Sequence, residues 1–106
     1  MITAEQIRAG KAIAEQAGLA MYAKIGERDA CGFGWVEVYV DRTNSKQAKE
    51  LIAAGFRKDY KPKCLSMWDP AGVPTQSISV KEAGAYALAE YLSSLGLKAY
   101  AGSRLD

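Results

Sequence analysis

Residues 31–40 carry the clearest pattern of apolar and polar positions in the chain. Every second position from 36 to 40 is a valine. The alternate positions hold two large rings around a carboxylate: Trp35, Glu37 and Tyr39. Because successive side chains of a strand point to opposite faces, the pattern predicts a strand with one valine face in the core. The second face resembles neither a core face nor a solvent face, and the function is expected to depend on what covers it.

A long amphipathic helix is predicted before this strand. Thr3 and Gln6 have the spacing of a capping box, in which each side chain binds the backbone amide of the other residue. The apolar stripe continues to about Lys24, and Gly26 suits the helix end. Alanine and glycine dominate the stripe, so this helix is expected to lie close against a flat surface.

Two further helices are predicted after the strand. The turn at residues 41–45 offers several N-cap residues for the second helix, and Gly55 suits its end. The third helix is predicted to start at another capping box, formed by Ser79 and Glu82, and to stop at Gly96. This last segment has the strongest helical period of apolar residues in the chain.

Three short segments are predicted as strands: residues 56–60, 64–68 and 97–101. Residues 102–106 are expected to form a loosely ordered tail. After the first helix, the order of strand, helix, strand, strand, helix and strand is the split βαβ pattern of ferredoxin-like domains. Right-handed crossovers then give an antiparallel four-stranded sheet with spatial order 4-1-3-2. The predicted fold class is α+β, a ferredoxin-like βαββαβ sheet with an extra N-terminal helix.

The length of 106 residues fits a single domain over residues 1–106, with an N-terminal helix at 1–26 and a βαββαβ core at 31–101. The second and third helices are expected to cover the valine face. Three arrangements are open for the opposite face. The N-terminal helix could cover it, two copies could pair through it, or a ligand could stack on its rings.

Composition excludes several kinds of chemistry. The chain has no histidine, which removes Ser-His and Cys-His catalysis and histidine-ligated metals. Cys31 and Cys64 cannot complete a zinc site, and buried free thiols are expected. No catalytic set, cofactor or metal is predicted. The amino terminus has no signal pattern and no apolar run could span a bilayer, so we expect a cytoplasmic protein without a membrane partner.

A basic segment at residues 57–63 holds four of the fourteen basic residues around a tyrosine. Basic residues mixed with rings suit a phosphate backbone with stacked bases. The same composition is typical of an edge hairpin whose lysines prevent edge-to-edge pairing, and this interpretation is preferred. A buried Glu37 needs a basic partner, for which Lys98 and Arg104 are candidates. The candidate residues for binding a ligand or partner are Trp35, Glu37, Tyr39, Arg57, Lys58, Tyr60, Lys61, Lys63, Trp68, Asp69 and Tyr100.

Four segments resemble those of small tailed-bacteriophage proteins: Cys31–Val36, Ala54–Lys58, Lys81–Ala85 and Ala99–Asp106. That group has no assigned activity, so the resemblance implies no catalytic residue. It implies a setting, the cytoplasm of an infected bacterium. Small phage proteins of this kind often bind host proteins or nucleotides.

These observations favour a non-enzymatic binding module, a phage accessory protein that acts on a host protein. The surface would be the ring-bearing sheet face, the basic segment and the loop at residues 69–78. The alternative is nucleic-acid or nucleotide binding by the same rings and cations. A compact enzyme is the last of the three hypotheses. It is ranked last because no set of nucleophile, base and orienting group can be assembled from the sequence.

Overall fold

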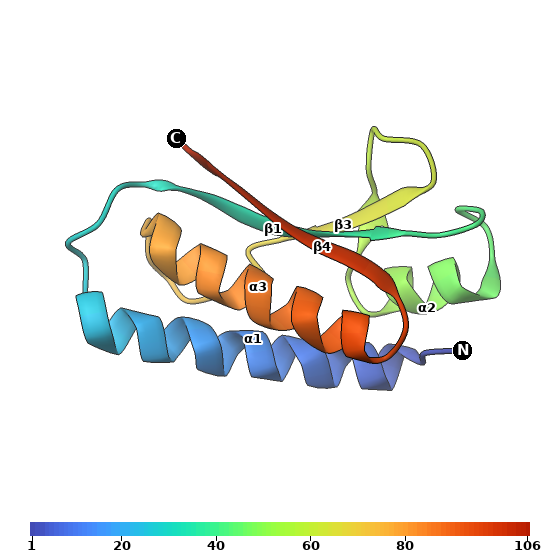
Figure 1. The fold of residues 1–106 in the computed structure, drawn as a ribbon, viewed down its shortest axis with the longest axis horizontal. Helices are drawn as coiled ribbons and strands as arrows, with labels where there is room; N and C mark the ends of the chain where they lie inside the picture. The colour runs from blue at the N-terminus through green and yellow to red at the C-terminus, as the bar shows by residue number, and fades with distance from the viewer.

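The computed structural model describes residues 1–106 and contains three helices and a four-stranded antiparallel sheet (Figure 1). The helices are α1 (Ala4–Ile25), α2 (Lys46–Ala53) and α3 (Ile78–Ser94). The strands are β1 (Gly32–Tyr39), β2 (Arg57–Lys58), β3 (Cys64–Trp68) and β4 (Lys98–Leu105). The fold is α+β with an open sheet, as the sequence predicts.

Strand β1 lies inside the sheet, in which the strand order is β2-β3-β1-β4. Trp35 of β1 stands opposite Trp68 of β3 on one side and opposite Gly102 of β4 on the other. Read from the opposite edge, this is the order 4-1-3-2 that the sequence predicts. Because β1 has a neighbour along each edge, its two faces define the two layers of the molecule.

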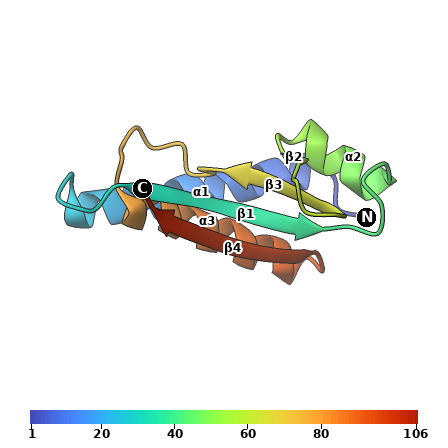
Figure 2. The same cartoon turned by 90° about the horizontal axis from the view of Figure 1, so that it is seen from above.

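Helices α1 and α3 lie side by side on the valine side of the sheet, while α2 packs near one end (Figures 1 and 2). Ile7 and Ala14 of α1 share one buried core with Val36, Val38 and Leu88. The prediction that α2 and α3 cover the valine face is therefore confirmed for α3 only, because α2 adds Ala48 and Leu51 at one end of this core. The possibility of an α1 lid over the rings is wrong. With only eight residues, α2 is too short to span the sheet, and the 22-residue α1 takes that position.

Glycine allows α1 to approach α3 closely. A Cβ atom at Gly10 would lie 2.7 Å from both Leu88 and Tyr91, so a larger residue would push the helices apart. The Tyr91 hydroxyl donates a hydrogen bond to the Gln6 carbonyl at 3.1 Å. The capping box of Thr3 and Gln6 is present as predicted. The small residues of α1 therefore do mark close packing, but against a helix rather than against the ring-bearing face.

Helix α3 begins two residues earlier than the sequence predicts, because Ser77 is its N-cap instead of Ser79. The Ser77 hydroxyl oxygen accepts a hydrogen bond from the Val80 amide. Asp29, in the loop before β1, accepts from the Ser77 hydroxyl at 2.6 Å and from the Ser79 amide at 2.8 Å. These hydrogen bonds lower the pKa of Asp29 to about 2. The helix start is thus completed by a carboxylate distant in sequence.

Strand β4 is longer than the sequence predicts. Residues 102–105 continue the ladder with β1 and do not form a loose tail. Leu105 stands opposite Gly32, and the Asp106 amide still donates to the Cys31 carbonyl at 3.1 Å. The stretch has no apolar alternation of its own, so its strand structure comes from pairing with β1.

The loop between β3 and α3 is anchored against α1. Ala71 and Val73 are buried with Val80 in a second, smaller apolar cluster. A Cβ atom at Gly18 of α1 would lie 2.7 Å from the Ala71 methyl group. This part of the predicted binding loop is therefore a packed connection.

Candidate functional site

The side of the sheet opposite α1 and α3 is open, and in the view from above no helix passes in front of it (Figure 2). We call this surface the aromatic face. Residues paired across antiparallel strands share a face, so the register defines its members. They are Phe33, Trp35, Glu37 and Tyr39 of β1, Arg57 of β2, Cys64, Ser66 and Trp68 of β3, and Lys98, Tyr100, Gly102 and Arg104 of β4.

Three rings form a stack at one end of the aromatic face. The Trp35 indole lies over Gly102, where a Cβ atom would be 2.5 Å from the ring. Trp68 stacks on Trp35 with 4.6 Å between ring centroids and 22° between planes. Phe33 meets Trp68 edge-on at 6.0 Å. Trp35 is thus held between backbone and ring, while Trp68 remains 50% exposed.

A second ring pair lies further along the same face. Tyr39 and Tyr100 contact each other edge-to-face, with 6.0 Å between centroids and 67° between planes. Tyr100 is 59% exposed. The aromatic face therefore offers two ring surfaces to a partner, one at each end of a row of side chains on β1.

Glu37 lies between the two ring groups and is fully engaged. It accepts hydrogen bonds from Trp35 Nε1 at 2.9 Å, from the Tyr39 hydroxyl at 3.0 Å and from Lys61 Nζ at 2.9 Å. Partial burial raises the pKa of Glu37, but the hydrogen bonds from Lys61, Trp35 and Tyr39 outweigh it, and the net pKa lies below its usual value. The same contact raises the pKa of Lys61.

The basic partner of Glu37 is therefore Lys61, and the prediction of Lys98 or Arg104 is wrong. Lys61 reaches Glu37 from the connection between β2 and β3, 24 residues away in sequence. As a result Lys98 and Arg104 stay free of any carboxylate. The Arg104 guanidinium lies 5.3 Å from the centre of the Phe33 ring, within the range of a cation–π contact.

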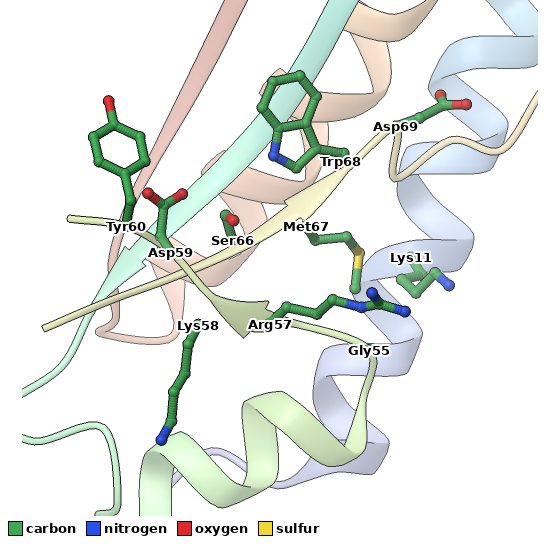
Figure 3. A pocket seen from close by; sticks show the side chains of 10 residues that line it. All are labelled: Lys11, Gly55, Arg57, Lys58, Asp59, Tyr60, Ser66, Met67, Trp68 and Asp69. Atoms are coloured by element: carbon green, nitrogen blue, oxygen red, sulfur yellow. The ribbon is translucent and has the colours of Figure 1, made fainter. Parts of the chain in front are cut away.

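A groove of about 590 Å³ borders Trp68 at the β2–β3 edge, and Figure 3 shows Arg57 and Trp68 on its walls. Three cations, Lys11, Arg57 and Lys58, line it together with the two carboxylates of Asp59 and Asp69. The other lining residues are Gly55, Tyr60, Ser66 and Met67. The groove therefore continues from the ring stack toward a basic rim.

The structure brings most of the predicted site residues together in these two places. The aromatic face contains Trp35, Glu37, Tyr39, Trp68 and Tyr100, and Lys61 reaches it through Glu37. The groove collects Arg57, Lys58, Tyr60 and Asp69 beside Trp68. Lys63 lies apart from both sets, in an exposed turn where its carbonyl accepts from the Val40 amide.

Several residues of the site were not among the predicted candidates, including the ring of Phe33 and the cations of Lys98, Arg104 and Lys11. Phe33 could have been found by extending the alternation two positions before Trp35. Arg104 and Lys98 were considered only as ion-pair partners of Glu37, and the strand that places Arg104 beside Phe33 was not expected in the tail. Lys11 lies on α1, and only the packing of α1 beside α3 brings it to the rim of the groove.

The thiols and carboxylates form no further constellation. Cys64 is buried, which raises the pKa of its thiol, but Cys31 is exposed, so the prediction of two buried thiols is wrong for Cys31. No group of three or more Cys, Asp or Glu side chains is arranged to hold a metal ion. None of the helices combines the length and the apolar character that a membrane crossing needs.

Comparison with known proteins gives no relative. No protein-family model, no curated protein and no solved structure matches the chain. The aromatic face and the adjoining groove are therefore the observations on which a functional proposal rests.

Proposed function

We propose that the protein is a non-enzymatic binding module of the ferredoxin-like, split βαβ class whose aromatic face binds single-stranded nucleic acid. The observation that supports this most is the combination of stacked, half-exposed rings with unpaired cations on one open sheet face. Rings on the central strands of four-stranded split βαβ domains stack bases in a well-established mode of RNA recognition.

The charge of the aromatic face suits a polyanion. Arg57, Lys98 and Arg104 have no carboxylate partner, whereas the carboxylate of Glu37 is neutralised by Lys61. These four cations outnumber the three carboxylates on or beside the face, which are Glu37 and, by continuation of the register, Asp59 and Asp106. Phosphate contacts from the three unpaired cations would provide sequence-independent affinity.

The ring geometry suits unpaired bases. Trp68 is supported from behind by Trp35, and Trp35 in turn rests on Gly102, so the outer ring is rigid before a ligand arrives. A base stacked on an aromatic side chain contributes about 1–3 kcal/mol. A strand of nucleic acid could place one base on Trp68 and another on Tyr100, with its backbone along Arg57 and the groove.

The same charge argues against pairing of two copies through this face, because like charges would meet. A host-protein partner, which the sequence favours, becomes the interpretation if oligonucleotides do not bind. The setting we propose is a bacterial cytoplasm during infection, as the resemblance to tailed-bacteriophage proteins suggests.

Binding of a labelled single-stranded oligonucleotide, followed by fluorescence anisotropy at several salt concentrations, tests this function. Trp68→Ala should weaken binding by about tenfold or more, because it removes the main stacking surface. Arg104→Gln should weaken binding of all sequences similarly and reduce the slope of log affinity against log salt by about one.

Two matched changes away from the aromatic face serve as controls. Lys49→Gln removes an exposed cation on α2, and Leu19→Ala truncates an exposed apolar residue on α1. Both should leave binding unchanged. Absence of binding at low salt, or binding that survives Trp68→Ala undiminished, would overturn the proposal.

A further inference from the structure

The two edges of the sheet differ in a way that the proposed function does not use. The β2 edge has only two residues, both charged, which is a common protection against unwanted strand pairing. Strand β4 has eight residues. It forms the opposite edge of the sheet, with no strand beyond it (Figure 2). A long edge strand presents a row of backbone groups that can pair with another chain.

The direction of the β4 backbone groups follows from one hydrogen bond. The Asp106 amide donates to Cys31 next to β1, so even-numbered residues of β4 face β1 and odd-numbered residues face outward. Among these outward groups, the Ala99 carbonyl accepts from the Ser93 hydroxyl at 3.1 Å. Ala101, Ser103 and Leu105 have neither amide nor carbonyl bonded on that side.

We propose that β4 pairs antiparallel with β4 of a second copy of this chain, with Gly102 facing the partner's Gly102. The two sheets would then form one continuous eight-stranded sheet about a two-fold axis. A two-fold axis perpendicular to the sheet keeps both aromatic faces on the same side and brings the two α3 helices together beneath it. Such isologous pairing uses the same surface on both copies.

The side chains of β4 select this register. With Gly102 on the axis, Lys98 stands opposite the partner's Asp106, and each copy contributes one such pair of opposite charges. Tyr100 stands opposite the partner's Arg104, a cation–π combination, and Ala99 opposite the partner's Leu105. A register centred one residue earlier would instead set Lys98 against the partner's Arg104, so like charges disfavour it.

The contacts between α3 and β4, on the helix side of the sheet, also support pairing of two copies along β4. Glu82 of α3 accepts from the Ser103 hydroxyl at 2.6 Å, and Ser93 of α3 bonds to Ala99, so this face of α3 runs under β4. Tyr86 lies one turn after Glu82 on the same helix face and is 56% exposed. Leu105 on the strand above is 67% exposed. Pairing across the two-fold axis would cover both side chains.

The dimer does not depend on nucleic-acid binding, and its test measures molar mass alone. Sedimentation equilibrium from micromolar to millimolar protein should give a mass that rises to twice that of one chain. Ala101→Pro removes an outward amide and spares the ladder with β1, so this variant should remain a monomer throughout. Ala101→Ser keeps the amide and should still dimerise. A wild-type monomer at millimolar protein, or an Ala101→Pro dimer, would overturn the proposal.

A charge exchange tests the register and does not rely on the proline variant being folded. Asp106→Lys places two pairs of like charges across the axis and should raise the dimer dissociation constant about tenfold. Adding Lys98→Glu to Asp106→Lys restores opposite charges and should return the constant to near the wild-type value. Failure of this rescue contradicts the proposed register.

Cross-linking gives a direct readout of the same register. Positions 100 and 104 of the two copies form a pair whose backbone groups face away from each other, with Cα atoms expected about 4.5 Å apart. Tyr100→Cys combined with Arg104→Cys, in a Cys31→Ser background, should form a disulfide-linked dimer on mild oxidation. Tyr100→Cys alone should not, and equal cross-linking of both variants would refute the register.

Discussion

The two faces of the sheet are built from alternate residues of the same strands, yet only one of them is closed. Val36 and Val38 are fully buried beneath α1 and α3. Trp35 and Tyr39, their neighbours in sequence, remain half-buried on the aromatic face. The valine face is held mainly by apolar packing against the two helices. The aromatic face is held by ring stacking and by hydrogen bonds that converge on Glu37.

This difference shows how large aromatic side chains can remain at the protein surface in a fixed arrangement. The polar atoms of Trp35 and Tyr39 both bind Glu37, so they need neither water nor a covering helix. Lys61 cancels the charge that would otherwise repel an anionic ligand. The exposed rings are therefore ordered before any partner arrives, which lowers the entropy cost of binding.

The comparison predicts the largest loss of stability on the valine side. Leu65 and Trp68 lie on β3, but Leu65 is fully buried and Trp68 is half-exposed. Leu65→Ala should lower the free energy of unfolding by about 3 kcal/mol through cavity formation. Trp68→Ala should cost about 1–2 kcal/mol, mostly the stack on Trp35. Urea denaturation of the two variants measures both values, and an equal cost would mean that the aromatic face is part of the core.

A smaller effect is expected where the ring stack meets the backbone. Gly102→Ala would place a methyl group 2.5 Å from the Trp35 indole in the present geometry, so the ring has to move. We expect a loss of about 2 kcal/mol, typical of overpacking, and a shift in tryptophan fluorescence. In a Trp35→Leu background the same change should cost less, because the clash is gone. Equal costs in both backgrounds would show that Gly102 serves another purpose.

The smallest effect concerns the charge at the centre of the aromatic face. Lys61→Met removes the cation beside Glu37, so the pKa of Glu37 should rise, as measured by NMR titration of its carboxyl carbon. Because the folded-state pKa of Glu37 is lowered, its contribution to stability is present above the unfolded pKa of about 4.3 and is lost as pH falls through the folded value.

We expect Lys61→Met to lower the stability slightly at neutral pH and less in acid, where Glu37 is protonated. Lys63→Met, in the exposed turn nearby, should change neither the pKa of Glu37 nor the stability. If the two lysine variants behave alike, the hydrogen bond from Lys61 does not control the ionisation of Glu37.

Much of the architecture follows from local sequence patterns. The alternation around Val36 predicts the inner strand and its two faces, and the Thr3 capping box predicts the start of α1. The order of elements predicts the strand order, because right-handed crossovers leave few alternatives. The alternation within each of residues 31–40 and 64–68, together with the predicted pairing of these strands, predicts that Trp35, Tyr39 and Trp68 share a face. Each of these predictions starts from residues close together in the chain.

Tertiary packing alone decided which side α1 covers, which cation meets Glu37 and how far β4 extends. The Ala and Gly stripe of α1 indicates close packing but not its partner, and Gly10 meets α3 rather than the rings. Lys61 reaches Glu37 only because β3, which follows Lys61 in sequence, pairs with β1. Residues 102–105 become a strand only because β1 offers an edge. Each choice depends on contacts between distant surfaces, which no periodicity along a single segment encodes.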